Sequence, residues 1–169
     1  EVETNGTLSA REVVSLSAKV VQDHTQLFVD LVENMKDVEI LTSKQNVLYD
    51  VPKLYQHDVP SIGGSICSPT TTTMMLKFYG HSFLDLGYNF EHEYVARMAY
   101  DNGDEIFGNW SYCVAVMGAV GEFSYVKRFT GPNELINYLS VVGPVGLSVK
   151  GNMQGYYNTN GHLLVCKGY

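Results

Sequence analysis

The sequence predicts an α+β domain in which helices come first and most strands come last. Apolar residues recur at helical spacing in four stretches between residues 68 and 142. Short apolar or alternating runs bounded by glycines dominate the C-terminal part. The 169 residues are 45% hydrophobic and 17% charged, a composition typical of a globular chain that buries a core.

The first fifty residues carry two overlapping apolar patterns. Val13, Leu16, Val20 and Leu27 recur as on a helix, while Val14, Leu16, Ala18 and Val20 alternate as in a strand. Many β-branched residues and turn-like breaks favour short strands, with the last near residues 38–41. Pro52 and Pro60 then predict an extended backbone that leads into the main domain. We therefore expect a β-rich segment over residues 1–50, compatible with the remnant of an upstream domain, and a main domain over residues 51–169.

The main domain is expected to hold four helices and three strands. The first helix covers residues 68–79, because Pro69 fits its first turn and Gly80 can end it. The other helices are predicted at residues 90–100, 110–120 and 132–142. The strands are predicted at residues 123–129, 145–149 and 162–167.

Charge and hydropathy exclude several partners. The chain has 18 acidic and 11 basic side chains, a net charge of −7, and no basic stripe, so nucleic acid is not an expected partner. No apolar stretch reaches the roughly 18 to 20 residues that cross a bilayer, and no signal peptide is present. A chain that begins at Glu1 is what trimming of a signal peptide or upstream domain would leave. The composition does not indicate an oligomeric state.

Cys67 is the candidate nucleophile. It follows the glycine loop at residues 63–64 and stands where the first helix begins. Unpaired backbone N–H groups and the positive end of the helix dipole favour a thiolate there. The alternative is a cysteine that packs as a small hydrophobic residue. Cys113 and Cys166 have no C-x-x-C spacing to each other or to Cys67, so neither a zinc site nor a disulfide framework is expected.

His162 is the best placed of five histidines to serve as the base. It follows Asn160-Gly161 and opens an apolar strand-like run, from which a side chain can reach a cleft. His57 is the second candidate, whereas His24, His81 and His92 fit surface or capping positions. No pair has the H-E-x-x-H spacing of a zinc hydrolase, so no metal or other cofactor is expected.

Gln56 is the candidate donor to a developing oxyanion. Acyl transfer needs such donors, and a side-chain amide from the loop before Cys67 can act together with the Cys67 backbone N–H. A solvated loop glutamine is the alternative.

Six motifs in this order resemble a known family: Gln56, residues 63–74 around Cys67, residues 108–110, 125–129 and 143–145, and residues 161–165. Over about residues 51–169 the chain resembles the stand-alone bacterial relatives of the bacteriocin-processing (double-glycine) peptidases, in the papain-like cysteine peptidase superfamily. The resemblance implies a papain-like fold, in which helices carrying Cys67 pack on an antiparallel sheet carrying His162. It also implies Gln56 in the oxyanion role, no metal, a peptide or protein substrate, and a secreted or cell-surface location in a bacterium.

One departure concerns the residue that orients the histidine. In the family an Asp or Asn on the strand after the histidine has this role, and here the sequence stops at Tyr169. We therefore expect the domain to lack its C-terminal strands, and we expect this form to lose much of its activity unless residues after Tyr169 supply the third group. The sequence predicts a cysteine peptidase that forms a thioester on Cys67. The alternatives are a peptidoglycan amidase or transpeptidase with the same Cys-His pair, and a binding domain without turnover.

Overall fold

The computed structural model of the chain describes Lys19 and residues 46–169. The chain divides into two units, Glu1–Gln45 and Asn46–Tyr169, and the second unit holds every site residue named above. The strands predicted before residue 45 lie outside the described residues.

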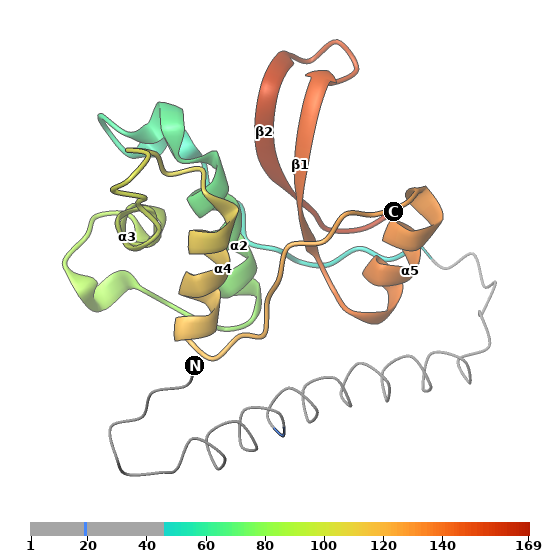
Figure 1. The fold of residues 1–169 in the computed structure, drawn as a ribbon, viewed down its shortest axis with the longest axis horizontal. Helices are drawn as coiled ribbons and strands as arrows, with labels where there is room; N and C mark the ends of the chain where they lie inside the picture. Colours follow the sequence, from blue (N-terminus) through green and yellow to red (C-terminus); the bar gives the residue numbers. More distant parts are fainter. Residues whose placement is uncertain (1–18, 20–45) are drawn as a thin grey trace, which may run out of the picture. The chain divides into compact units, whose positions relative to one another are not determined.

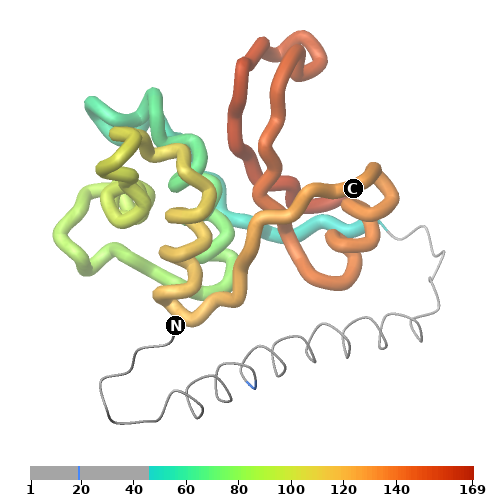
Figure 2. Tube along the Cα trace, in the orientation of Figure 1, coloured from blue at the N-terminus to red at the C-terminus, as the bar shows by residue number. Residues whose placement is uncertain are grey.

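Residues 46–169 form an α+β structure, as predicted (Figure 1). Its helices are α2 (Cys67–Phe78), α3 (Glu91–Met98), α4 (Trp110–Ala119) and α5 (Pro132–Val141). Its strands are β1 (Val145–Asn152) and β2 (Asn158–Cys166), and three single-turn 3-10 helices are η1 (Gln56–Asp58), η2 (Gly63–Ser65) and η3 (Leu84–Leu86). The path of the chain through these elements is followed most easily along the tube in Figure 2.

The two strands form an antiparallel hairpin that packs on α2. Val149 pairs with His162, and Leu147 pairs with Leu164. The hairpin therefore carries His162 on the strand that lies beside the helix of Cys67 (Figure 1). The predicted strands at residues 145–149 and 162–167 were correct in place but too short.

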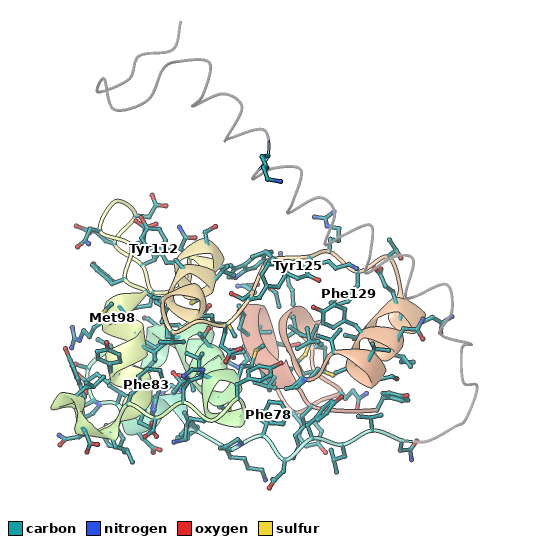
Figure 3. The ribbon with its side chains drawn as sticks, turned by 90° about the horizontal axis from the view of Figure 1, so that it is seen from below. Phe78, Phe83, Met98, Tyr112, Tyr125 and Phe129 are labelled. Carbon is teal, nitrogen blue, oxygen red and sulfur yellow. The ribbon has the colours of Figure 1, made fainter. Side chains whose placement is uncertain are left out.

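The strand predicted at residues 123–129 is wrong. Within the described chain this stretch forms no backbone hydrogen bonds to a neighbouring strand. Side chains hold it instead: the Ser124 hydroxyl donates to the Val114 carbonyl, and Tyr125 bonds the Tyr138 hydroxyl on α5. Phe129 also lies against Tyr138 and is seen beside α5 in Figure 3. The alternating pattern reflects aromatic contacts with helices, not the two faces of a sheet.

The core lies between the helices. Seven buried side chains form the main cluster: Leu76, Phe83, Val95, Ala99, Cys113, Val116 and Met117. A smaller cluster joins Val59 and Ile66 of the loop region to Ala96 of α3. The loop that leads to Cys67 is thereby packed on α3.

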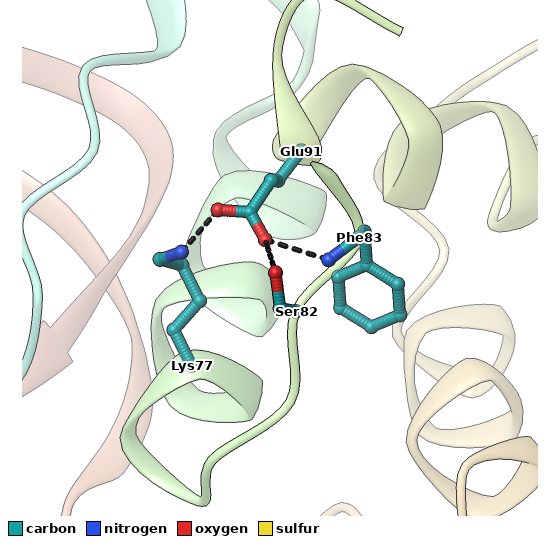
Figure 4. A network of polar contacts seen from close by, with 4 residues as sticks. All are labelled: Lys77, Ser82, Phe83 and Glu91. Atoms are coloured by element: carbon teal, nitrogen blue, oxygen red, sulfur yellow. Dashed lines mark hydrogen bonds and ion pairs between the residues drawn. The ribbon is translucent and has the colours of Figure 1, made fainter. Parts of the chain in front are cut away.

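A polar network links α2 to α3 (Figure 4). The buried carboxylate of Glu91 accepts hydrogen bonds from the Lys77 ammonium, the Ser82 hydroxyl and the Phe83 backbone N–H. Burial alone would raise the pKa of Glu91, but these donors outweigh it and lower that pKa. The network fixes the two helices against each other at the edge of the core.

Candidate active site

Cys67 is the first residue of α2 and is partly accessible to solvent. No side chain from Lys19 or residues 46–169 caps the start of this helix, so its first backbone N–H groups remain available to an anion. The following residues Ser68, Pro69 and Thr70 are buried, which holds the start of the helix in place. The sulfur thus sits at an open helix N-terminus on a rigid support.

Gln56 is the first residue of η1, and within the described part of the chain one hydrogen bond holds its side chain. Its Nε2 donates to the Gly63 carbonyl oxygen across 2.7 Å. An amide NH2 group has two hydrogens, so one remains free for another acceptor. Gly63 permits this arrangement, because a Cβ there would lie 2.7 Å from the Gln56 carbonyl oxygen and 2.9 Å from the His57 Cα.

His162 lies in β2, with its ring partly buried. Burial lowers the pKa of the imidazole below its ordinary value of 6.5, which favours the neutral form that can accept a proton. The Tyr157 ring meets it edge to face, with ring centroids 5.8 Å apart. No side chain in the described part of the chain hydrogen-bonds to the imidazole, so packing rather than a carboxylate orients it.

One cavity of about 590 Å³ brings the three predicted residues together. Gln56, Cys67 and His162 all line it. The remaining lining side chains are uncharged or histidine: Leu54, Tyr55, His57, Thr70, Thr71, Met74, Tyr157, Asn158, Thr159, Leu163 and Leu164, with the backbone of Gly64. Cys67 and His162 both line this cavity, and among the described residues no hydrogen bond joins their side chains. A thiol, an imidazole and an amide residue therefore lie around one cavity.

The comparison with protein families decides what kind of chain holds this cavity. Residues 48–169, more than half of the chain, match the Peptidase_C39 like family. This chain belongs to that family. The matched range contains every element from η1 to β2 and all three candidate site residues.

Other comparisons concern short segments of this Peptidase_C39 like chain. The DNA-directed RNA polymerase subunit alpha of Clostridium beijerinckii is 46% identical to it over 46 residues, 27% of this chain and 15% of that protein. The same subunit of Clostridium perfringens is 47% identical over 45 residues, 27% of this chain and 14% of that protein. The chain thus spans about one seventh of the length of these curated relatives. No solved structure matches it.

The remaining cysteines of this family member lie away from the cavity. Cys113 is buried in the helical core, where its sulfur lies 3.2 Å from the Ser68 hydroxyl. Burial raises the pKa of the Cys113 thiol. The Cys166 thiol donates to the Gly168 carbonyl at 3.6 Å. Neither cysteine lines the cavity that holds His162.

The other described histidines have separate surroundings. His57 lines the same cavity, but its ring lies against Tyr55, with centroids 5.2 Å apart. His81 contacts Glu122 across 2.7 Å. His92 is buried on α3, contrary to the surface or capping position expected for it, and its ring centroid lies 5.7 Å from that of Phe90. His24 lies outside the described residues.

Tyr157 is a site residue that sequence reasoning missed. It stands at the turn side of β2 and lines the cavity next to His162. A tyrosine next to Tyr156 in a polar turn carries no periodic signal, and the conformation of the short segment between Tyr157 and His162 brings the two rings together. Its position five residues before His162 is the one local hint.

Two further findings concern membrane-spanning helices and metal-ligand groups. No helix among the described residues is long and apolar enough to cross a membrane. Within the same residues, no three His, Cys, Asp or Glu side chains are grouped as metal ligands would be.

Proposed function

We propose that this chain is a papain-like cysteine peptidase that hydrolyses a peptide or amide bond. Cys67 is the nucleophile, His162 the general base and acid, and Gln56 a donor to the oxyanion. The observation that carries the proposal is the shared cavity, which gathers these three side chains from η1, α2 and β2. Membership in the Peptidase_C39 like family supports the same chemistry.

The first chemical step forms a thioester. His162 takes the Cys67 proton, and the sulfur attacks the carbonyl carbon of the substrate. The oxygen gains negative charge and accepts hydrogen bonds from the Cys67 backbone N–H and the free amide hydrogen of Gln56. The C–N bond then breaks, and the amine leaves with the proton that His162 returns.

The second step releases the acyl group. His162 removes a proton from water, the hydroxide adds to the thioester carbonyl, and the C–S bond breaks. The proton returns to the sulfur, and the carboxylic acid product leaves. A depressed His162 pKa suits this cycle, because the base must be neutral before each attack.

The cavity lining supports a substrate that is uncharged beside the scissile bond. Among the described residues no Asp, Glu, Lys or Arg side chain lines the cavity, so a charged substrate side chain would lose water there without gaining a partner. Short peptides with small or apolar residues on both sides of the cleaved bond are therefore the substrates of choice for a test.

Alkylation with iodoacetamide tests the nucleophile without knowledge of the substrate. Cys67 and Cys166 are both partly accessible, so exposure alone predicts similar rates. Near pH 7 we expect Cys67 to react at least about tenfold faster, because a thiolate rather than a thiol is the attacking form. His162→Gln should slow the reaction of Cys67 and leave Cys166 unchanged. Equal rates in the wild-type chain would count against the proposal.

Peptide cleavage tests the full reaction. A library of uncharged peptides should be cleaved by the wild-type chain and not by Cys67→Ser. Cys166→Ser is the matched control and should retain cleavage. Cleavage that survives Cys67→Ser would show that another group, or a contaminating peptidase, is responsible.

A further inference from the structure

A second cavity, of about 450 Å³, takes no part in the proposed mechanism. Among the described residues, six aromatic side chains line it: Tyr79, Trp110, Phe123, Tyr125, Phe129 and Tyr138. We call it the aromatic cavity. Two of these residues, Tyr125 and Phe129, are labelled in Figure 3 on the segment that runs from α4 to α5. The volume is within the range of roughly 300–1,000 Å³ that is typical of pockets for small molecules.

The aromatic cavity adjoins the proposed catalytic residues without containing them. Ser68, the residue after Cys67, lines it. Leu163, the residue after His162, lines it as well. Thr71 and Leu163 also line the cavity of Cys67, so the two cavities share a wall. A molecule in the aromatic cavity therefore lies behind the proposed catalytic residues and not among them.

The charged groups of the aromatic cavity already have partners. In the described chain, its charged side chains are Glu122 and Lys127. The Glu122 carboxylate lies 2.7 Å from His81 Nε2, and the Lys127 ammonium lies 2.7 Å from the Glu134 carboxylate. A charged ligand would lose its water there and find no free counter-ion. An uncharged ligand fits these surroundings better.

The Thr71 hydroxyl is a buried polar group that lacks a partner. Thr71 is 3% exposed, and no hydrogen bond to its hydroxyl is formed within the described chain. The next residue, Thr72, instead donates to the Ser68 carbonyl oxygen at 3.0 Å. Buried polar groups are usually hydrogen-bonded, and a threonine in a helix has two favourable rotamers. The Thr71 hydroxyl can therefore turn to meet an oxygen atom in the aromatic cavity.

We propose that the aromatic cavity is a second binding site, for an uncharged aromatic molecule that carries one hydroxyl group. The lining rings contact the ring of the ligand by offset stacking or edge to face. The Thr71 hydroxyl bonds the ligand oxygen. Because Cys67 and His162 line the other cavity, this ligand leaves their cavity open. The proposal does not depend on peptidase activity.

NMR titration with 2-naphthol tests the site directly. This probe has two fused aromatic rings and one hydroxyl, and it is uncharged at pH 7. Trp110 is the single tryptophan of the chain, so its indole N–H gives one signal, and the residue lines the aromatic cavity. We expect 2-naphthol to shift that signal with a dissociation constant below about 1 mM, an ordinary affinity for so small a ligand. A signal that shows no saturable shift would overturn the proposal.

A variant that fills the cavity shows where the probe binds. Ser148 on β1 lines the aromatic cavity and is exposed, so Ser148→Phe should block binding while the chain stays folded. Lys150→Phe is the matched control. Lys150 is exposed two residues further along the same strand and lines neither cavity. Binding that survives Ser148→Phe, or that Lys150→Phe removes equally, would contradict the proposed place.

A second pair of variants tests the hydroxyl. Thr71→Val keeps the shape of the side chain and should weaken binding by about fivefold, because one hydrogen bond is lost. Thr72→Val should leave the dissociation constant unchanged, since the Thr72 hydroxyl is bonded within α2. If the two variants bind 2-naphthol equally well, Thr71 does not bond the ligand and the proposed ligand class is wrong.

A side chain of the peptide substrate is the alternative occupant. Peptide cleavage in the presence of 2-naphthol separates the two cases, because a ligand of a second site does not exclude the substrate. Competitive inhibition that Ser148→Phe removes would make this cavity part of the substrate site and overturn the proposal. A chain without Cys67-dependent turnover would refute the proposed function, and the NMR titration would still decide whether the aromatic cavity binds its ligand.

Discussion

The side-chain amide of Gln56 donates to the Gly63 carbonyl across 2.7 Å, and the same glycine packs directly on the Gln56 backbone. A Cβ at residue 63 would lie 2.7 Å from the Gln56 carbonyl oxygen, too close for the backbone to accept without moving. Two turns, η1 and η2, are therefore held together at one point. That point lies between the proposed oxyanion donor and the loop that leads to Cys67.

Gly63→Ala should displace η1 and weaken both folding and turnover. We expect a loss of roughly 1–3 kcal/mol in the free energy of unfolding, as for other overpacked sites, and a fall in kcat of about tenfold or more. Gly64→Ala is the matched control for stability, because open space surrounds a Cβ there. Chemical denaturation measures the loss of stability, and peptide cleavage measures the fall in kcat. An equal loss of stability in the two variants would contradict the close approach at Gly63.

Tyr157 should matter to the reaction through its ring. Tyr157→Leu removes the edge-to-face contact with His162, which is worth about 0.5–1.5 kcal/mol, and should lower kcat/KM several-fold. Tyr157→Phe keeps the ring and should behave as the wild type. Tyr156→Leu is the control, since that neighbouring side chain is 88% exposed. If Tyr157→Phe were as impaired as Tyr157→Leu, the hydroxyl and not the ring would be the important group.

His162 should make stability depend on pH in a defined direction. Its folded pKa lies below the ordinary 6.5, so the unfolded chain binds more protons as the pH falls below 6.5. The stability that neutral His162 contributes is present above pH 6.5 and is lost as the pH falls through the folded pKa. NMR titration should place the midpoint below 6.5. His162→Gln should reduce the loss of stability between pH 7 and 5. The part of this loss that comes from His92, whose pKa burial also lowers, should remain. A midpoint above 6.5 would show that a nearby anion outweighs burial.

The Glu91 network should be important for stability and not for chemistry. Glu91→Gln removes the charge that Lys77 and the Phe83 N–H stabilise, and should lower the free energy of unfolding by about 1–3 kcal/mol at pH 7. The pKa of Glu91 is lowered from 4.5, so its contribution is present above pH 4.5 and is lost as the pH falls through the folded pKa. The difference in the free energy of unfolding between the wild-type chain and Glu91→Gln should therefore become smaller as the pH falls below 4.5.

Glu93→Gln is the control for this measurement. Glu93 pairs with Arg97 one turn along the same helix, at 3.3 Å, and the arginine is well exposed. Such surface pairs contribute about 0.3–0.5 kcal/mol. In urea denaturation at pH 7, Glu91→Gln should have a much lower free energy of unfolding than Glu93→Gln. The reverse order would show that the network in Figure 4 does not link α2 to α3.

Local patterns predicted most of the described elements. Pro69 and Gly80 bracket α2, and the apolar runs before and after residue 150 form the hairpin. The run at residues 123–129 was misread, because alternation describes a side-chain pattern and not the hydrogen bonds of a sheet. A strand needs a partner backbone, and whether one is present depends on the rest of the fold.

The sequence by itself determined the helices, the two hairpin strands and the identity of Gln56, Cys67 and His162 as candidate site residues. Short-range chemistry suffices for these, since caps, glycine loops and apolar periodicity act between near neighbours. Only the tertiary structure decided that the three residues line one cavity, that Gly63 fixes the Gln56 amide, and that Tyr157 packs on His162. The cavity joins η1, α2 and β2, which lie far apart in the chain, and the two shorter-range contacts depend on turns whose conformation the packing of the whole fold decides.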